Sequence, residues 1–199
     1  MIVAMRLEVP LLARPFHPRG RVQARPVVIR VGHRPGGAPH EGLARVAGQV
    51  IPCVLGRSGI RRVKREGDGA SPAGRFALGA LLFRPDRGPR PRTGLPLRPV
   101  RASDGWCDDP ASAFYDRYIP APAAVSHETL VRVDALYDRV ILPALPARRR
   151  GRGSAIFVHV ARPDGAGGWR GTAGCVAFPR VVFDRLMPRL GARPVVVIG

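Results

Sequence analysis

The stretch that decides the fold is residues 154–178, SAIFVHVARPDGAGGWRGTAGCVAF. Its first apolar residues predict a strand that ends near His159, and Cys175 follows sixteen positions later. A thiol is a weak nucleophile until a base takes its proton, so a Cys and a His that a loop brings together can form an acyl-transfer site. The small residues before Cys175 let the backbone turn sharply and aim its N–H groups at a developing oxyanion.

A second patterned segment lies upstream at residues 64–76, KREGDGASPAGRF, and the two segments together resemble the L,D-transpeptidases, the YkuD-like family of bacterial cell-wall enzymes. In that family a strand ends in a His, a loop follows, and a [Ser/Thr]-x-Gly-Cys-hydrophobic segment carries the nucleophile. The upstream segment matches the family's [Thr/Ser]-Pro-x-Gly-x-Phe turn and strand. With residues 105–110 between them, the resemblance covers roughly residues 43–190.

The resemblance implies a role for each matching residue. Cys175 is the nucleophile, and His159 deprotonates it or forms an ion pair with it. The carbonyl of Val160, or one nearby, orients the imidazole ring. Backbone N–H groups of Gly174 and Cys175 hold the oxyanion, and Thr172 braces the loop or donates from its hydroxyl.

By the same resemblance, the donor substrate is a peptidoglycan stem peptide with diaminopimelate at its third position. A thioester on Cys175 then passes to an amine of a second stem, which cross-links the cell wall, or to water, which makes the enzyme an L,D-carboxypeptidase. The resemblance implies the stem peptides and the glycan as partners and no cofactor. We expect no metal either, because none of the five histidines has a partner at metal-ligand spacing.

Two positions depart from the family pattern. Many members have His where this chain has Ala173, and many have Arg or Asn where it has Ala177. These departures concern substrate details more than the acyl transfer, which needs only Cys, His and backbone donors. They also motivate an alternative, a catalytically silent wall-binding module.

Four residues are candidates for contact with the substrate. Trp106 stacks on the substrate or fills the core, and His127 is a second acid/base or a structural histidine bonded to Glu128. Arg92 belongs to the Pro-rich segment 84–99, which forms either an arginine-lined flap beside the site or a solvated loop. Ala173 lies two residues before Cys175, near the nucleophile that the resemblance implies.

Other side chains near these motifs also have two interpretations. Asp108 and Asp109 bind the ammonium of diaminopimelate or cap a turn, and Tyr137 is expected in the core. The basic run 148–153 is a solvated turn or a contact for substrate carboxylates.

The formal net charge of +19 has two interpretations. It attracts an anionic partner such as nucleic acid, a membrane surface or a wall polymer, or it reflects a composition bias that favours surface arginine. Lys64 is the single lysine among 33 basic residues, which fits such a bias. A nucleic-acid binder is therefore a further alternative, but no sequence-specific nucleic-acid motif accompanies the charge.

Three cysteines leave an odd count. If Cys175 is the nucleophile, Cys53 and Cys107 can form a disulfide, but the apolar run around Cys53 favours a small buried core residue.

The rest of the chain predicts one mainly-β domain over residues 25–199, after an N-terminal extension over residues 1–24. Apolar residues at helical spacing predict a helix over 181–190, which Pro188 ends or kinks. By resemblance, the fold is a β-sandwich-like catalytic domain with one or two short helices. The other predicted strands are residues 27–31, two short strands within 43–55 joined by a turn at Gly48-Gln49, and residues 76–83, 137–142 and 195–198.

The N-terminal residues have no basic segment followed by a long apolar core, so no secretory signal is visible. No stretch reaches the about 20 apolar residues of a membrane span. The family resemblance nevertheless implies a location in the cell envelope or periplasm. The oligomeric state is open.

Overall fold

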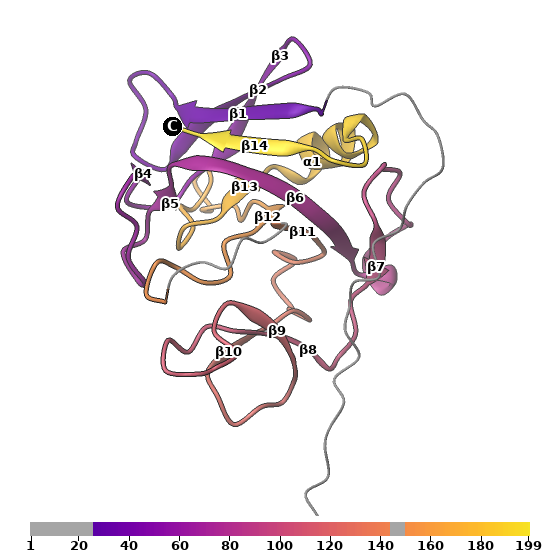
Figure 1. Cartoon of the computed structure of the whole chain (residues 1–199). Coiled ribbons are helices and arrows are strands. Elements are labelled where there is room, and N and C mark those ends of the chain that lie inside the picture. Colours follow the sequence, from indigo (N-terminus) through magenta and orange to yellow (C-terminus); the bar gives the residue numbers. More distant parts are fainter. Residues whose placement is uncertain (1–25, 144–149) are drawn as a thin grey trace, which may run out of the picture.

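The computed structural model describes residues 26–143 and 150–199 (Figure 1). Strands dominate this part of the chain, and its one α-helix is short, which confirms the predicted mainly-β fold. The predicted extension 1–24 and part of the basic run, residues 148–149, lie outside the described residues. The boundary at residue 25 stays a prediction.

The main feature is a large sheet whose pairings form a closed circuit. In the described residues its strand order is β11-β12-β13-β3-β2-β1-β14-β6-β7, and β11 also pairs with β6. The sheet is therefore barrel-like, with β7 as an added edge strand. Its strands are β1 (Val28–His33), β2 (Glu41–Val46), β3 (Gln49–Val54), β6 (Gly74–Phe83), β7 (Leu97–Pro99), β11 (Arg139–Pro143), β12 (Val158–Val160), β13 (Val176–Phe178) and β14 (Val195–Ile198).

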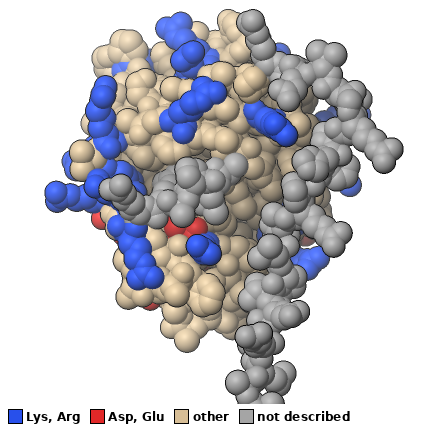
Figure 2. Space-filling view, in the orientation of Figure 1, with Lys and Arg blue, Asp and Glu red and all other residues tan. Residues whose placement is uncertain are grey.

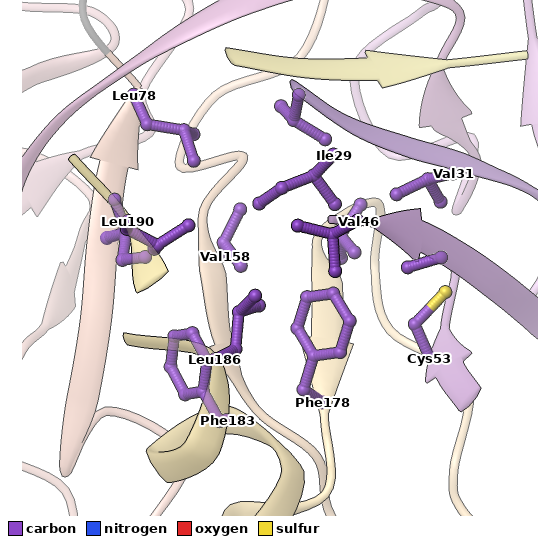
Figure 3. Packing of buried hydrophobic residues seen from close by; sticks show 14 of the residues in the cluster. Ile29, Val31, Val46, Cys53, Leu78, Val158, Phe178, Phe183, Leu186 and Leu190 are labelled. Atoms are coloured by element: carbon purple, nitrogen blue, oxygen red, sulfur yellow. The ribbon is translucent and has the colours of Figure 1, made fainter. Parts of the chain in front are cut away.

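Side chains that alternate along the strands fill the core. Ile29 and Val31 of β1 are buried while Arg30 between them is exposed, as a half-buried strand requires. The helix α1 (Arg180–Leu186) places Phe183 against this core, where its ring stacks on Phe178 (Figure 3). The helix thus fixes the strand β13, which begins directly after Cys175.

A three-stranded sheet of β8 (Asp104–Cys107), β9 (Arg117–Pro120) and β10 (His127–Thr129) lies beside the large sheet (Figure 1). The strands β4 (Ile60–Arg61) and β5 (Ser71–Pro72) form a two-stranded parallel pair. The strand β5 belongs to the upstream motif, so this pairing holds the motif in place. These two small sheets supply parts of the candidate site.

Most expected elements are present, with shifted ends. The hairpin of β2 and β3 turns at Ala47 and Gly48, one residue earlier than predicted, because both adopt positive φ there. The predicted helix ends at Leu186 and continues as the 3-10 turn η2 (Met187–Arg189), which contains Pro188. The Pro-rich segment holds only the 3-10 turn η1 (Pro85–Arg87) and the edge strand β7.

Among the described residues, the helices are too short or too polar to cross a membrane.

Candidate active site

Cys175 and His159 come from adjacent elements of the large sheet. The strands β12 and β13 run parallel, with His159 of β12 opposite Ala177 of β13. Cys175 directly precedes β13, so it lies at the start of the strand that neighbours the histidine's strand. The Cys175 sulfur donates to the Ala155 carbonyl at 3.2 Å and accepts from the Phe157 N–H at 3.3 Å. The thiol is therefore held between two polar backbone groups.

Thr172 braces the loop that carries Cys175. Its hydroxyl donates to the Cys175 carbonyl at 2.7 Å and accepts from the Gly174 N–H at 3.1 Å. Gly174 has a φ of +148°, and a Cβ there would lie 2.8 Å from the Ala70 carbonyl oxygen and 2.8 Å from Ile156 Cδ1. Only glycine fits this close approach.

The upstream motif meets the nucleophile loop directly. The Ser71 hydroxyl donates to the Cys175 carbonyl at 3.3 Å and accepts from the Gly56 N–H at 2.9 Å. Gly56 also bridges to Thr172. The two segments that carry the family resemblance are thus joined at Cys175, although 104 positions separate Ser71 from it.

His159 is held by the residue that the resemblance implied. Its Nδ1 lies 2.8 Å from the Val160 carbonyl oxygen. Because a carbonyl can only accept, Nδ1 carries the proton and Nε2 keeps the lone pair. Burial lowers the pKa of His159 to about 4, although the bond to Val160 acts in the opposite direction. The ring is therefore neutral at pH 7 and able to accept a proton.

Tyr137, expected in the core, is buried but also lines the same pocket as His159 and Cys175. Its ring makes an edge contact with the His159 ring, with centroids 5.5 Å apart. Its hydroxyl donates to Glu128, and Arg132 lies over its face. Burial raises the pKa of Tyr137, and the charge of a Cys175 thiolate raises it further. The apolar run 137–142 contained no signal for this position.

Cys175 and His159 both line a pocket of about 540 Å³. Four arginines and three acidic residues line it as well, so it can accept both carboxylate and ammonium groups. Arginines also spread over the face of the molecule seen in Figure 2. The charged lining residues are Arg57, Arg132, Arg162 and Arg170 with Glu66, Asp108 and Glu128.

Ala173 lines this pocket, but the other three predicted substrate contacts do not. Trp106 is 4% exposed, packs edge-on against Phe157 and donates its ring N–H to Asp116, so it fills the core. His127 bonds to the Val125 carbonyl rather than to Glu128.

Arg92 is exposed, and no residue of the segment 84–99 lines the pocket; the segment ends in the edge strand β7, which pairs with β6. The structure thus places this segment outside the pocket, and a contact of Arg92 with the substrate stays a prediction. Of the basic run 148–153, the described residues 150–153 also stay outside the lining, and it is Asp108 rather than Asp109 that reaches it.

The remaining cysteines are unpaired and buried. Cys53 lies in the main core cluster, as expected, and no disulfide links it to Cys107. Within residues 26–143 and 150–199, no group of His, Cys, Asp and Glu is arranged to hold a metal ion.

Comparison with known proteins agrees with this geometry. A model of the YkuD family, described as the L,D-transpeptidase catalytic domain, matches residues 43–198. Neither the curated proteins nor the solved structures contain a match to the chain. The family match spans most of the chain, including the upstream motif, His159 and Cys175. The chain belongs to the YkuD family of L,D-transpeptidase catalytic domains.

Proposed function

We propose that this protein is a peptidoglycan L,D-transpeptidase that works by cysteine acyl transfer. The observation that carries the proposal is the Cys175 sulfur, held by Ala155 and Phe157 at a pocket that the neutral His159 also lines. Both chemical requirements of the reaction, a positioned thiol and a base, meet in one cavity.

In the first half-reaction, His159 accepts the Cys175 proton while the sulfur attacks the peptide carbonyl of the donor stem. The Phe157 N–H stays in place and stabilises the developing thiolate. The tetrahedral intermediate then collapses. The carbon–nitrogen bond breaks, His159 returns the proton to the leaving D-alanine amine, and a thioester remains on Cys175.

In the second half-reaction, an amine of another stem attacks the thioester. His159 takes a proton from that amine, the carbon–sulfur bond breaks, and the proton returns to the Cys175 sulfur. A new amide bond joins the two stems, and the enzyme is regenerated. If water replaces the amine, the product is a free carboxylate and the reaction is that of an L,D-carboxypeptidase.

The oxyanion is held by the backbone N–H groups of Gly174 and Cys175. In the resting structure the Gly174 N–H donates to the Thr172 hydroxyl, so it exchanges this partner for the oxyanion when the substrate oxygen becomes charged. The Thr172 hydroxyl itself donates to the Cys175 carbonyl. Both bonds of Thr172 stay within the loop, which favours the bracing role over direct donation.

The mixed charge of the pocket supports a stem peptide as the substrate. A stem with diaminopimelate presents carboxylates and an ammonium group. Arg57, Arg162 and Arg170 suit the carboxylates, while Asp108 and Glu128 suit the ammonium. A peptidoglycan substrate places the reaction in the cell envelope.

The experiment that tests this function is intact-mass spectrometry with a carbapenem, a β-lactam class that acylates the nucleophile of this family. Wild type and Cys53→Ala should each gain one adduct, and Cys175→Ala should gain none. Cys53→Ala is a matched control, because it removes another buried thiol outside the pocket.

Purified muropeptides then identify the reaction. Cross-linked dimers support transpeptidation, and shortened stems alone indicate the carboxypeptidase. An adduct that persists in Cys175→Ala, or folded wild type that turns over no muropeptide, would contradict the proposal. The second outcome would favour the silent wall-binding module.

A further inference from the structure

Lys64 is the single lysine in a chain whose other 32 basic residues are arginine, and it is buried, with 5% exposure. Its ammonium donates to the Asp68 carboxylate at 2.5 Å and to the Arg65 carbonyl at 2.6 Å. Almost all charged side chains of this size remain in solvent, so a buried one needs a specific structural reason.

The partner of Lys64 organises the turn that follows it. The Asp68 carboxylate accepts from the Arg65 N–H at 2.8 Å and from the Ala70 N–H at 2.9 Å. Burial opposes the charge of Asp68, but the bonds from Lys64, Ala70 and Arg65 outweigh it and lower its pKa to about 2. The Asp68 carboxylate is therefore ionised over the whole physiological pH range.

The side chain of Lys64 lies between the two loops that hold the Cys175 sulfur. A Cβ on Gly174 would lie 3.5 Å from Lys64 Cε, and one on Gly153 would lie 3.0 Å from the same atom. Gly174 precedes the nucleophile, and Gly153 is two residues before Ala155, whose carbonyl accepts from the sulfur. Both loops thus pack against one lysine stem.

Arginine cannot replace this side chain without moving a loop. The guanidinium is a broad plane with five donors, whereas the ammonium is compact and has three. The stem of Lys64 lies close to the backbone of Gly153 and Gly174, and neither residue has a side chain that could move aside for a larger group. This difference in shape accounts for a lysine at this one position of an arginine-rich chain.

We propose that Lys64, paired with Asp68, is a positioning residue for Cys175, because it sets the spacing between the 153–155 loop and the 172–175 loop. The inference rests on the proposed function for its catalytic consequence. Its structural content is the placement of the sulfur between Ala155 and Phe157.

The test compares Lys64→Arg with Arg62→Lys. The first keeps the charge and changes the shape, and the second makes the reverse change at an exposed position two residues away. The readout is the rate at which iodoacetamide alkylates Cys175 in the folded protein across a pH series. Peptide mapping separates Cys175 from the two other thiols, and thermal unfolding confirms that each variant is folded.

We expect Lys64→Arg to slow Cys175 alkylation by about 10- to 100-fold and to move its pH midpoint, while Arg62→Lys matches wild type. With muropeptides, kcat should fall more than KM rises. A purely structural role would lower the melting temperature and leave the rate per folded molecule unchanged. That outcome would overturn the proposal.

A second variant covers the case in which Lys64→Arg does not fold. The pair Lys64→Met with Asp68→Asn removes both charges, keeps the stem of Lys64 as far as Cε and keeps the shape of Asp68. It should also slow the alkylation of Cys175, and a rate equal to wild type would overturn the proposal.

The wild-type protein offers a test that needs no variant. Because the chain has one lysine, lysine labelled with ¹³C at Cε gives a single NMR signal. That signal should shift when Cys175 is alkylated, and an unmoved signal would overturn the proposal if neither variant folds.

Alkylation of Cys175 needs no peptidoglycan. Wild type that does not turn over muropeptides would therefore refute the proposed function, and the alkylation rates of wild type and the Lys64 variants could still be compared.

Discussion

Cys53 and Cys175 are both buried, with 4% and 7% exposure, yet their surroundings differ completely. Cys53 lies on β3 among apolar side chains of the main core (Figure 3). Burial raises the pKa of its thiol to about 12, so it stays protonated. Cys175 lies between the Ala155 carbonyl and the Phe157 N–H and faces a pocket. The polar neighbours, rather than the exposure, distinguish Cys175, the proposed nucleophile, from Cys53 in the core.

The two cysteines also differ in the backbone that carries them. Cys53 belongs to a regular strand, where its sulfur fills the space that Gly42 on β2 leaves open. Cys175 follows a loop whose Gly174 adopts a φ closed to most side chains and whose Thr172 binds two backbone groups. Cys175 therefore follows a loop with an unusual backbone conformation that Thr172 braces, whereas Cys53 lies in an ordinary strand.

The largest effect should come from His159→Gln, which removes the base and makes Cys175 nearly as unreactive as Cys53. General-base catalysis contributes about 10²- to 10⁴-fold, so we expect a loss of that size in carbapenem acylation. The exposed His33 supplies a control, because His33→Gln should acylate at the wild-type rate. Equal rates for wild type and His159→Gln would show that the thiol is activated by another group.

The same histidine predicts the pH dependence. Because the neutral ring is the base, kcat/KM of wild type should hold through mildly acidic pH and fall as the pH passes about 4. The unfolded chain binds this proton first, near its ordinary pKa of 6.5. Wild type should therefore lose stability relative to His159→Gln as the pH falls from 6.5 to about 4, as urea unfolding at several pH values would measure. A constant difference would contradict a buried neutral His159.

The two cysteines also show which features of the fold and the site can be predicted from local sequence patterns. The mainly-β fold followed from local patterns, because strand alternation is encoded over short stretches. The two motifs also pointed to Cys175, His159, Thr172 and Gly174, whose catalytic roles stay a prediction. Cys53 was expected in the core from the apolar run around it.

Tyr137 and Lys64 carried no such signal. The role of Tyr137 depends on Glu128 and His159, which reach it from other strands, and that of Lys64 depends on Gly153 and Gly174. For Trp106 the sequence left a substrate contact and a core position open; the structure shows it buried on the strand β8, with its ring N–H donating to Asp116. Local sequence patterns could not predict these contacts, because the contacting residues are far apart in the sequence.

A smaller effect is expected for Thr172→Val, which keeps the shape of the side chain and removes its hydroxyl. The Gly174 N–H and the Cys175 carbonyl each lose a partner, and each bond is worth about 1 kcal/mol, so acylation should slow by about 30-fold at most. Thr172→Ser retains the hydroxyl and should restore most of the rate. If Thr172→Ser were as slow as Thr172→Val, packing of the methyl group rather than the bracing bonds would be responsible.

The smallest effect, and the sharpest comparison, comes from replacing each cysteine by serine and measuring urea unfolding. At position 53 the hydroxyl enters an apolar cluster, and an unpaired buried hydroxyl costs about 1–3 kcal/mol. At position 175 the hydroxyl finds an acceptor in Ala155 and a donor in Phe157, so Cys175→Ser should cost less than about 1 kcal/mol. Equal losses at the two positions would mean that the backbone groups around Cys175 are not a polar site prepared for its sulfur.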